Sequence, residues 1–213
     1  IRTRDGQELR IRSWEAIPEG IRWSTLCGAE IDLDFDAIRS LDLEAGRVMS
    51  LVDLEPTTLD WTPFVVDIAD RNRSLPGLTN LFAWERDLSF SGGPLSLSSE
   101  SGFGGEEESI RIFARGLALR SRTRLVYRLP EGYTRLGGWL GIDPESQPRG
   151  NVAVSIDGDG RRLWEGTLTG VDLEPIRLDL DVAGVSRLVI LIDFGTGGDL
   201  GDRLHWCEPR LVK

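Results

Sequence analysis

Lysine, histidine and cysteine are nearly absent from this sequence of 213 residues. Lys213 is the only lysine, His205 is the only histidine, and Cys27 and Cys207 are the only cysteines. A zinc site needs several closely spaced Cys or His ligands, so the small number of these residues argues against a zinc site. The two cysteines leave two alternatives open. They form one disulfide, or they are two separate buried thiols, and we favour the thiols.

Long apolar runs are also absent, so we expect no membrane insertion. Acidic residues outnumber basic ones by 35 to 25, which gives a net charge of −10. An acidic surface repels phosphate backbones and argues against a nucleic-acid partner. The same acidity suits calcium, and it suits an extracellular, periplasmic or cell-surface protein. Because the sequence starts at Ile1 without an initiator methionine, we expect a processed or shortened form.

Motifs for catalysis and phosphate binding are missing as well. No second histidine and no Gly-x-Ser-x-Gly turn accompany His205. The run 195–201 (GTGGDLG) lacks the Lys and Ser/Thr that end a phosphate-binding loop. The run 157–160 (DGDG) lacks the further oxygen ligands of an EF-hand and predicts a tight hairpin turn instead. We therefore expect that the protein is not an enzyme.

The first 44 residues predict a small antiparallel β meander. Within them, Ile31, Leu33 and Phe35 alternate with aspartates, and this period of two is typical of a half-buried strand. The pattern changes near residues 44–46. We therefore expect two domains, a meander at 1–44 and a larger β domain at 45–213.

The larger domain predicts a β-sandwich. Apolar and polar residues alternate at 125–129 and 176–182, and turns separate strands at a spacing of roughly 8–12 residues. The nearly continuous apolar run 188–194 is typical of a central strand that is covered on both faces. The Ser- and Glu-rich run 96–109 predicts an exposed loop. Together these patterns indicate an all-β jelly roll or sandwich.

Four motifs follow one another in a distinctive order. They are FARGLALRS (113–121), LVYRL (125–129), GWLGID (138–143) and the tail 189–206. This order resembles the NPCBM family of carbohydrate-binding modules, and the likeness extends from about residue 46 to residue 212. Two positions depart from the family pattern. Arg120 stands where the family usually has histidine, and His205 lies before Trp206 where the family often has aspartate.

The resemblance implies a galactose-binding-like jelly-roll sandwich that binds glycans without catalysis, as a lectin-like part of an exported protein. A glycan or polysaccharide would be its partner, together with other domains of a larger parent protein. One alternative stays open, because a fold carries many functions. The alternative is a protein-interaction or scaffold module of a cell-surface assembly without sugar binding, which the departures at Arg120 and His205 would suit.

A sugar site needs an apolar aromatic surface and polar side chains that exchange hydrogen bonds with hydroxyls. Among the seven tryptophans, Trp84 and Trp206 lie beside polar residues, whereas Trp139 lies in a strand that looks buried. We therefore expect the aromatic platform at Trp206 or Trp84. The expected hydrogen-bonding partners of the sugar are Asp202, His205 and Arg120.

Two aspartates, Asp193 and Asp199, flank a glycine-rich turn near Trp206. Carboxylates near a loop can ligate calcium. They can equally stabilise the turn by accepting hydrogen bonds from backbone N–H groups. Calcium is therefore the one cofactor that the sequence suggests, with Asp193 and Asp199 as its candidate ligands.

Overall fold

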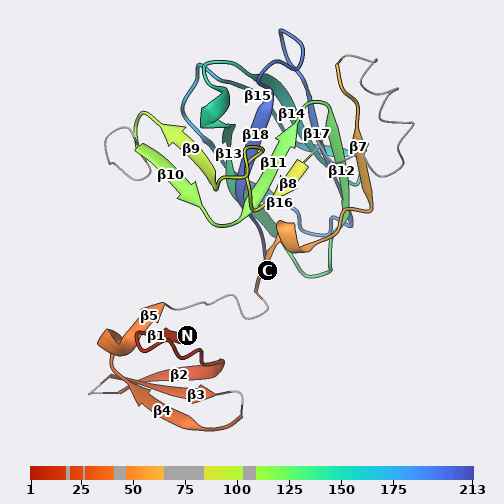
Figure 1. The fold of residues 1–213 in the computed structure, drawn as a ribbon. Helices are drawn as coiled ribbons and strands as arrows, with labels where there is room; N and C mark the ends of the chain where they lie inside the picture. The colour runs from red at the N-terminus through yellow and green to blue at the C-terminus, as the bar shows by residue number, and fades with distance from the viewer. Residues whose placement is uncertain (18–19, 26, 41–46, 65–83, 103–108) are drawn as a thin grey trace. The chain divides into compact units, whose positions relative to one another are not determined.

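The computed structural model describes residues 1–17, 20–25, 27–40, 47–64, 84–102 and 109–213 (Figure 1). The chain divides into two compact units, Ile1–Arg47 and Val48–Lys213, and each is described by itself. The predicted join at 44–46 lies outside the described residues, and the division into domains 1–44 and 45–213 stays a prediction. No helix in the described ranges has the length and apolar character needed to cross a membrane.

The first unit contains the predicted antiparallel meander. Strands β2, β3 and β4 pair in this order, and β1 pairs with β5. A small core of Ile1, Ile21 and Trp23 holds the unit together. The elements of this unit are β1 (Arg2–Thr3), β2 (Ile11–Ile17), β3 (Gly20–Thr25), β4 (Glu30–Leu33), the 3-10 turn η1 (Phe35–Ala37) and β5 (Ile38–Ser40).

The second unit is built on two sheets whose strands all pair antiparallel. In the sheet that we call the six-stranded sheet, the order is β16-β13-β18-β11-β8, and β6 also pairs with β18. Its strands are β6 (Val48–Ser50), β8 (Trp84–Arg86), β11 (Gly116–Arg120), β13 (Arg135–Ile142), β16 (Ile176–Asp181) and β18 (Arg203–Val212).

The five-stranded sheet has the order β15-β14-β17-β12-β7. Two short 3-10 turns, η2 (Leu51–Asp53) and η3 (Pro144–Ser146), lie between strands. The run 157–160 forms the predicted hairpin turn between β14 and β15. The strands of this sheet are β7 (Thr58–Trp61), β12 (Thr123–Arg128), β14 (Asn151–Gly158), β15 (Arg161–Thr169) and β17 (Arg187–Phe194).

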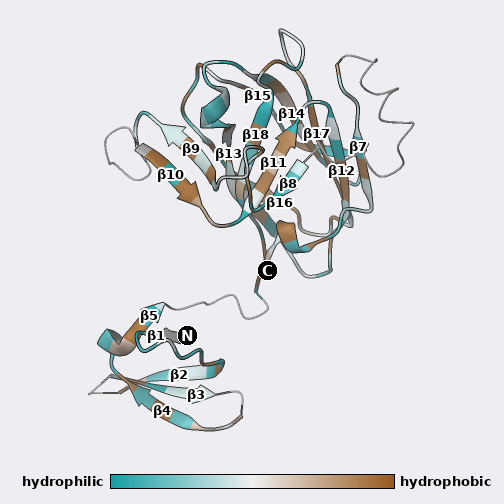
Figure 2. Ribbon diagram, viewed as in Figure 1, coloured by the Kyte–Doolittle hydropathy of each residue, from teal (hydrophilic) through white to brown (hydrophobic). Residues whose placement is uncertain are grey.

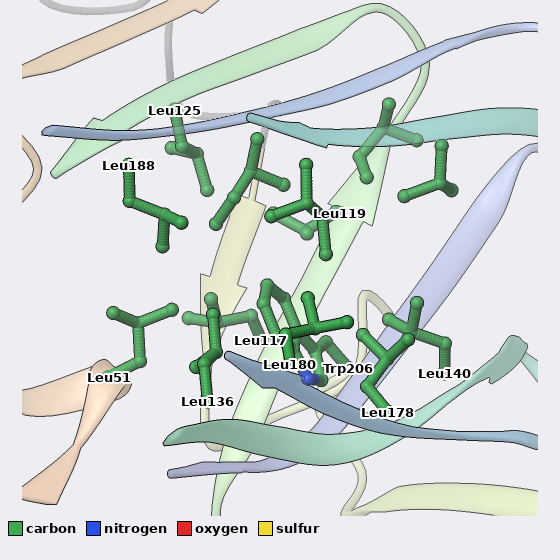
Figure 3. Close-up of a cluster of buried hydrophobic side chains, with 14 of the residues drawn as sticks. Leu51, Leu117, Leu119, Leu125, Leu136, Leu140, Leu178, Leu180, Leu188 and Trp206 are labelled. Carbon is green, nitrogen blue, oxygen red and sulfur yellow. The ribbon is translucent and has the colours of Figure 1, made fainter. Parts of the chain in front are cut away.

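The core of the second unit lies between these two sheets (Figure 3). Successive residues of a strand point to opposite faces, so the apolar positions of each strand gather on the face toward the other sheet. Hydrophobic segments run along strands of both sheets in Figure 2. The core includes Leu117 and Leu119 of β11, Leu125 of β12, and Ile190 of β17. The prediction of an all-β sandwich preceded by a meander is thereby confirmed.

Strand β17 is central in its sheet, between β14 and β12, as predicted. Only one of its faces is fully covered, however. Leu188, Ile190 and Ile192 are buried, while Val189 and Leu191 are half-buried on the outer face. The continuous apolar run therefore predicts more burial than the outer face of β17 has.

The prediction of an exposed loop at 96–109 is wrong at both ends. Strands β9 (Leu95–Ser99) and β10 (Ser109–Phe113) pair antiparallel; residues 103–108 lie outside the described ranges. This hairpin covers part of the outer face of the six-stranded sheet, where Leu95, Leu97 and Phe113 pack against Ala118 and Cys207. Serines at alternate positions of β9 hid this strand from a search for apolar runs.

Two glycines of the family motifs allow this hairpin to approach the sheet. A Cβ atom on Gly141 would lie 2.6 Å from a methyl of Leu97, and one on Gly116 would lie 2.7 Å from a methyl of Leu95. Real Cβ atoms essentially never come so close. At Gly116 a Cβ atom would also lie 2.5 Å from the backbone oxygen of Trp206, so this position requires glycine, whereas at Gly141 only the side chain of Leu97 would have to shift.

Both cysteines are free thiols, and only Cys207 is buried. Cys27 is exposed, and a hydrogen bond with Thr25 (3.1 Å) lowers the pKa of its thiol. Burial raises the pKa of the Cys207 thiol. Because the thiolate is the reactive form, Cys27 should react with Ellman's reagent in the native protein and Cys207 only after unfolding. The Cys27→Ser variant should lose the fast reaction, and a native protein with no reactive thiol would contradict this assignment.

Candidate binding site

Trp206 lies in the core and not on the surface. Its exposed fraction is 0%, and it points to the inner face of β18 together with Leu204 (Figure 3). The prediction of an exposed platform at Trp206 is wrong. Its polar neighbours in the sequence suggested a loop, whereas residues 203–212 form the long strand β18.

His205 points to the outer face of β18, but the β9–β10 hairpin covers it completely. Its Nδ1 donates to the carbonyl oxygen of Ser96 over 2.9 Å, and its Nε2 lies 3.6 Å from the Asp143 carboxylate. Burial lowers the pKa of His205, which favours the neutral ring. The prediction of a solvent-facing sugar partner at His205 is therefore wrong, because the residue holds the hairpin on the sheet.

Asp202 is also buried. Its carboxylate accepts hydrogen bonds from Ser121 Oγ (2.7 Å) and from the backbone N–H of Asn151 (2.8 Å). Burial raises the pKa of Asp202, and both hydrogen bonds oppose the rise. The prediction of an accessible hydrogen-bonding partner at Asp202 is wrong, because the carboxylate joins the starts of β14 and β18 to the end of β11.

Arg120 lies half-buried on the outer face of β11, paired with Arg203 of β18. Its guanidinium carbon lies 4.3 Å from the centroid of the Phe90 ring. Burial lowers the pKa of Arg120, and the neighbouring Arg203 lowers it further. Trp84 of β8 packs against the core and has the guanidinium of Arg86 over its ring at 4.5 Å.

The predicted residues therefore do not form one solvent-open site. Arg120, Asp202 and His205 lie near the same end of the six-stranded sheet, because Asp202 contacts the residue that follows Arg120 and β11 pairs with β18. Trp84 and Trp206 lie on the opposite, inner face. No surface that the described residues form combines these five side chains around a ligand.

The two predicted calcium ligands, Asp193 and Asp199, have different surroundings. Asp193 faces Arg122 at 3.3 Å and accepts from the backbone N–H of Phe194. Asp199 is exposed in the loop before β18. Among the residues that the structure describes, no three His, Cys, Asp or Glu side chains are arranged to hold a metal ion. The described residues therefore add no further carboxylate, Cys or His ligand to Asp193 and Asp199, and calcium at these two residues stays a prediction.

A different group of residues lines a hollow of about 440 Å³ on the outer face of the six-stranded sheet. We call it the Trp139 hollow. Strands β13, β16 and β18 form its base and Arg111 of β10 lies at its side. The hollow is lined by Arg111, Arg135, Gly137, Gly138, Trp139, Arg177, Leu178, Asp179, Glu208, Arg210 and Val212.

Two backbone features make this hollow. Gly137 has no side chain, and a Cβ atom there would approach only the Leu178 carbonyl, at 3.3 Å. The register between β13 and β18 shifts beside it, and Glu208 adopts a φ of 49°. Such a β-bulge bends a strand and redirects its side chains. Gly138 (φ 146°) must be glycine, since a Cβ atom would lie 2.5 Å from Trp206 Nε1.

Trp139 supplies the aromatic wall of the hollow. Its ring is partly buried and packs against the cluster under the β9–β10 hairpin. The guanidinium carbon of Arg177 lies 5.7 Å from the ring centroid. The neighbouring Asp179 accepts from Arg135 Nε (2.9 Å), which lowers the pKa of this carboxylate, and Arg177 lowers it further. Glu208 forms an ion pair with Arg210.

This arrangement can bind a polar ring that has one apolar face. An aromatic side chain packs against C–H groups, while charged side chains on both sides donate and accept hydrogen bonds. A second hollow of about 370 Å³ lies on the outer face of the five-stranded sheet. Its lining contains no aromatic residue, so the Trp139 hollow is the better candidate.

One feature of the sequence points to this site, namely the alternation of side chains within β13. In β13, Leu136, Leu140 and Ile142 point inward, so Trp139 at the intervening position points outward. The pairing of β13 with β16 then brings Arg177 opposite Trp139. This pairing joins segments that are far apart in the sequence, and the alternation within one strand does not reveal it.

Comparison with known proteins supports the fold independently. A module of family CBM51 from Clostridium perfringens GH95, solved with methyl-galactose, superposes with a TM-score of 0.60 at 16% identity, covering 78% of this chain and 99% of that one. The CBM51-2 and INT domains of C. perfringens ZmpB, solved with GlcNAc, give a TM-score of 0.62 at 18% identity, covering 98% of this chain and 42% of that one.

Tandem CBM51 modules of Sp3GH98, a family 98 glycoside hydrolase from Streptococcus pneumoniae, give a TM-score of 0.60 at 13% identity and cover 78% and 47% of the two chains. The chain thus spans less than half of the ZmpB and Sp3GH98 structures. No curated protein matches it. The family model of the NPCBM/NEW2 domain matches residues 74–212. The chain therefore belongs to the NPCBM/NEW2 domain family.

Proposed function

We propose that the second unit binds a carbohydrate without catalysis, in the Trp139 hollow. The observation that carries this proposal is a solvent-open hollow in which an aromatic ring, four arginines and two carboxylates lie together. The apolar face of a pyranose would pack on Trp139, and Asp179 and Glu208 would accept from its hydroxyls. Family membership supports the proposal, as do the two similar CBM51 structures that were solved with methyl-galactose and with GlcNAc.

The proposal includes export and a larger parent protein. Similar modules occur beside catalytic domains: one structure combines two CBM51 domains with the M60 catalytic domain of ZmpB, and another contains the modules of a glycoside hydrolase. The role proposed for this chain is to hold a neighbouring domain near a glycan at the surface of, or outside, the cell. Calcium at Asp193 and Asp199 stays a prediction, and repeating the binding measurements in calcium and in EDTA tests it.

Trp139→Ala should weaken glycan binding at least about tenfold, because it removes the aromatic wall of the hollow. A glycan array would identify the ligand of the wild-type protein, and isothermal titration calorimetry would measure the variants. Trp14→Ala is the matched control, since Trp14 is 60% exposed in the meander and should be silent. Equal affinities of wild type and Trp139→Ala for an identified glycan would contradict the proposed site.

A protein-interaction or scaffold module is the second candidate. Ile110 and Ile112 of β10 are each 66% exposed, and neighbouring apolar side chains at a surface suit a protein partner. A glycan array without any bound sugar, with and without calcium, would favour this candidate over sugar binding.

A further inference from the structure

The side chains that line the Trp139 hollow carry a net positive charge, whereas the chain as a whole carries a net negative charge. Its lining contains two carboxylates, Asp179 and Glu208, and four arginines from four different strands: Arg111, Arg135, Arg177 and Arg210. The chain as a whole has a net charge of −10. A concave surface of one sign concentrates ligands of the other sign, so this hollow would attract an anion that the rest of the surface repels.

Both carboxylates of the lining are held by arginines of the same lining. Arg135 donates to Asp179 (2.9 Å), and Arg210 pairs with Glu208. Arg135 and Arg210 are paired in this way, and the lining as a whole contains two more arginines than carboxylates. Arg177 lies on β16 beside Asp179, with its guanidinium over the ring of Trp139. A ring that packs on Trp139 would therefore meet this cation.

We propose that the ligand of the Trp139 hollow is an anionic sugar, with a carboxylate or a sulfate group that Arg177 recognises. This inference rests on the proposed function and adds the chemical class of its ligand. A guanidinium presents parallel N–H donors that match the oxygens of a carboxylate or sulfate, and such charge-assisted bonds are stronger than bonds to a neutral hydroxyl.

The abundance of arginine in this protein is not the reason for the inference. Nearly all cations of the chain are arginines, so an arginine on the surface is ordinary here. What distinguishes the hollow is the local excess of positive charge beside an aromatic ring, in a chain with ten more acidic than basic residues.

Polygalacturonate and its methyl ester test the carboxylate form of the ligand, and dextran sulfate and dextran test the sulfate form. The two members of each pair have the same sugar backbone, and only the first member carries negative charge. Affinity gel electrophoresis of the full chain should show at least about tenfold tighter binding to the charged member of one pair. The preference should shrink at high salt, because salt screens exposed charges.

Arg177→Gln should reduce the preference for the charged member about fivefold or more while leaving the melting temperature unchanged, because the side chain is exposed. Arg161→Gln, an exposed arginine of β15 in the other sheet, is the matched control and should keep the full preference. An equal loss in both variants would indicate attraction by overall charge and would overturn the inference.

The two proposals fail in different ways. Binding of neutral glycans on an array, with no preference for either charged polymer, overturns the anionic ligand and leaves carbohydrate binding intact. Absence of binding to every glycan, charged or neutral, overturns both proposals.

Discussion

Trp206→Ala is expected to lower the free energy of unfolding by about 3–5 kcal/mol, because it removes the largest of the fully buried side chains. Trp206 is 0% exposed between the two sheets, and the backbone of Gly138 packs against its ring nitrogen. The loss of stability has two contributions, the free energy gained by removing the indole from water and the cost of the cavity that remains. Urea unfolding followed by circular dichroism measures the effect.

Trp206→Phe serves as the graded control, since phenylalanine refills part of the cavity and should cost less than alanine. A contrasting outcome would be a Trp206→Ala variant with wild-type stability and no glycan binding. That outcome would indicate that Trp206 is exposed and contacts the sugar, and it would contradict the burial of Trp206 in the core.

Asp202→Ala is expected to destabilise the second unit by about 1–3 kcal/mol, because it leaves buried donors without an acceptor. The donors are the hydroxyl of Ser121 and the backbone N–H of Asn151. Asp202→Asn should retain most of the stability, since its side-chain oxygen can still accept from Asn151. Thermal melts of both variants provide the measurement.

Asp199→Ala is the matched control for Asp202, because Asp199 is exposed three residues earlier. Its melting temperature should equal that of the wild type, since surface substitutions typically change stability by less than about 0.5 kcal/mol. A marked loss of stability in Asp199→Ala, reversed by added calcium, would support the calcium interpretation against the present assignment.

The fold could be predicted because its signals are local. Alternation at Leu178 and Leu180 correctly placed both side chains in the core. The DGDG turn folds as predicted, with positive φ angles at Asp159 (49°) and Gly160 (83°). These features depend on residues that are neighbours in the sequence, so the sequence alone reveals them. Strand β9 was missed because its serines conceal Leu95 and Leu97, whose burial depends on packing against distant strands.

The site could not be predicted, because burial of polar residues depends on partners that are far away in the sequence. Asp202 accepts a hydrogen bond from Ser121, which is 81 residues away, and His205 donates one to the carbonyl oxygen of Ser96, which is 109 residues away. Without these partners both residues look like surface groups. Trp139 is the reverse case. The apolar strand around it predicts a buried side chain, but its own position faces outward and lines the hollow.

Two-dimensional ¹H–¹⁵N NMR tests the central claim most directly, with the glycan that binds most tightly titrated into the full chain. We predict that the largest shifts occur at the indole N–H of Trp139 and at the backbone amides of Gly137, Gly138 and Arg177. Shifts confined to the end of the sheet around Arg120, or to the outer face of the five-stranded sheet at Ala153 and Ser155, would contradict binding in the Trp139 hollow.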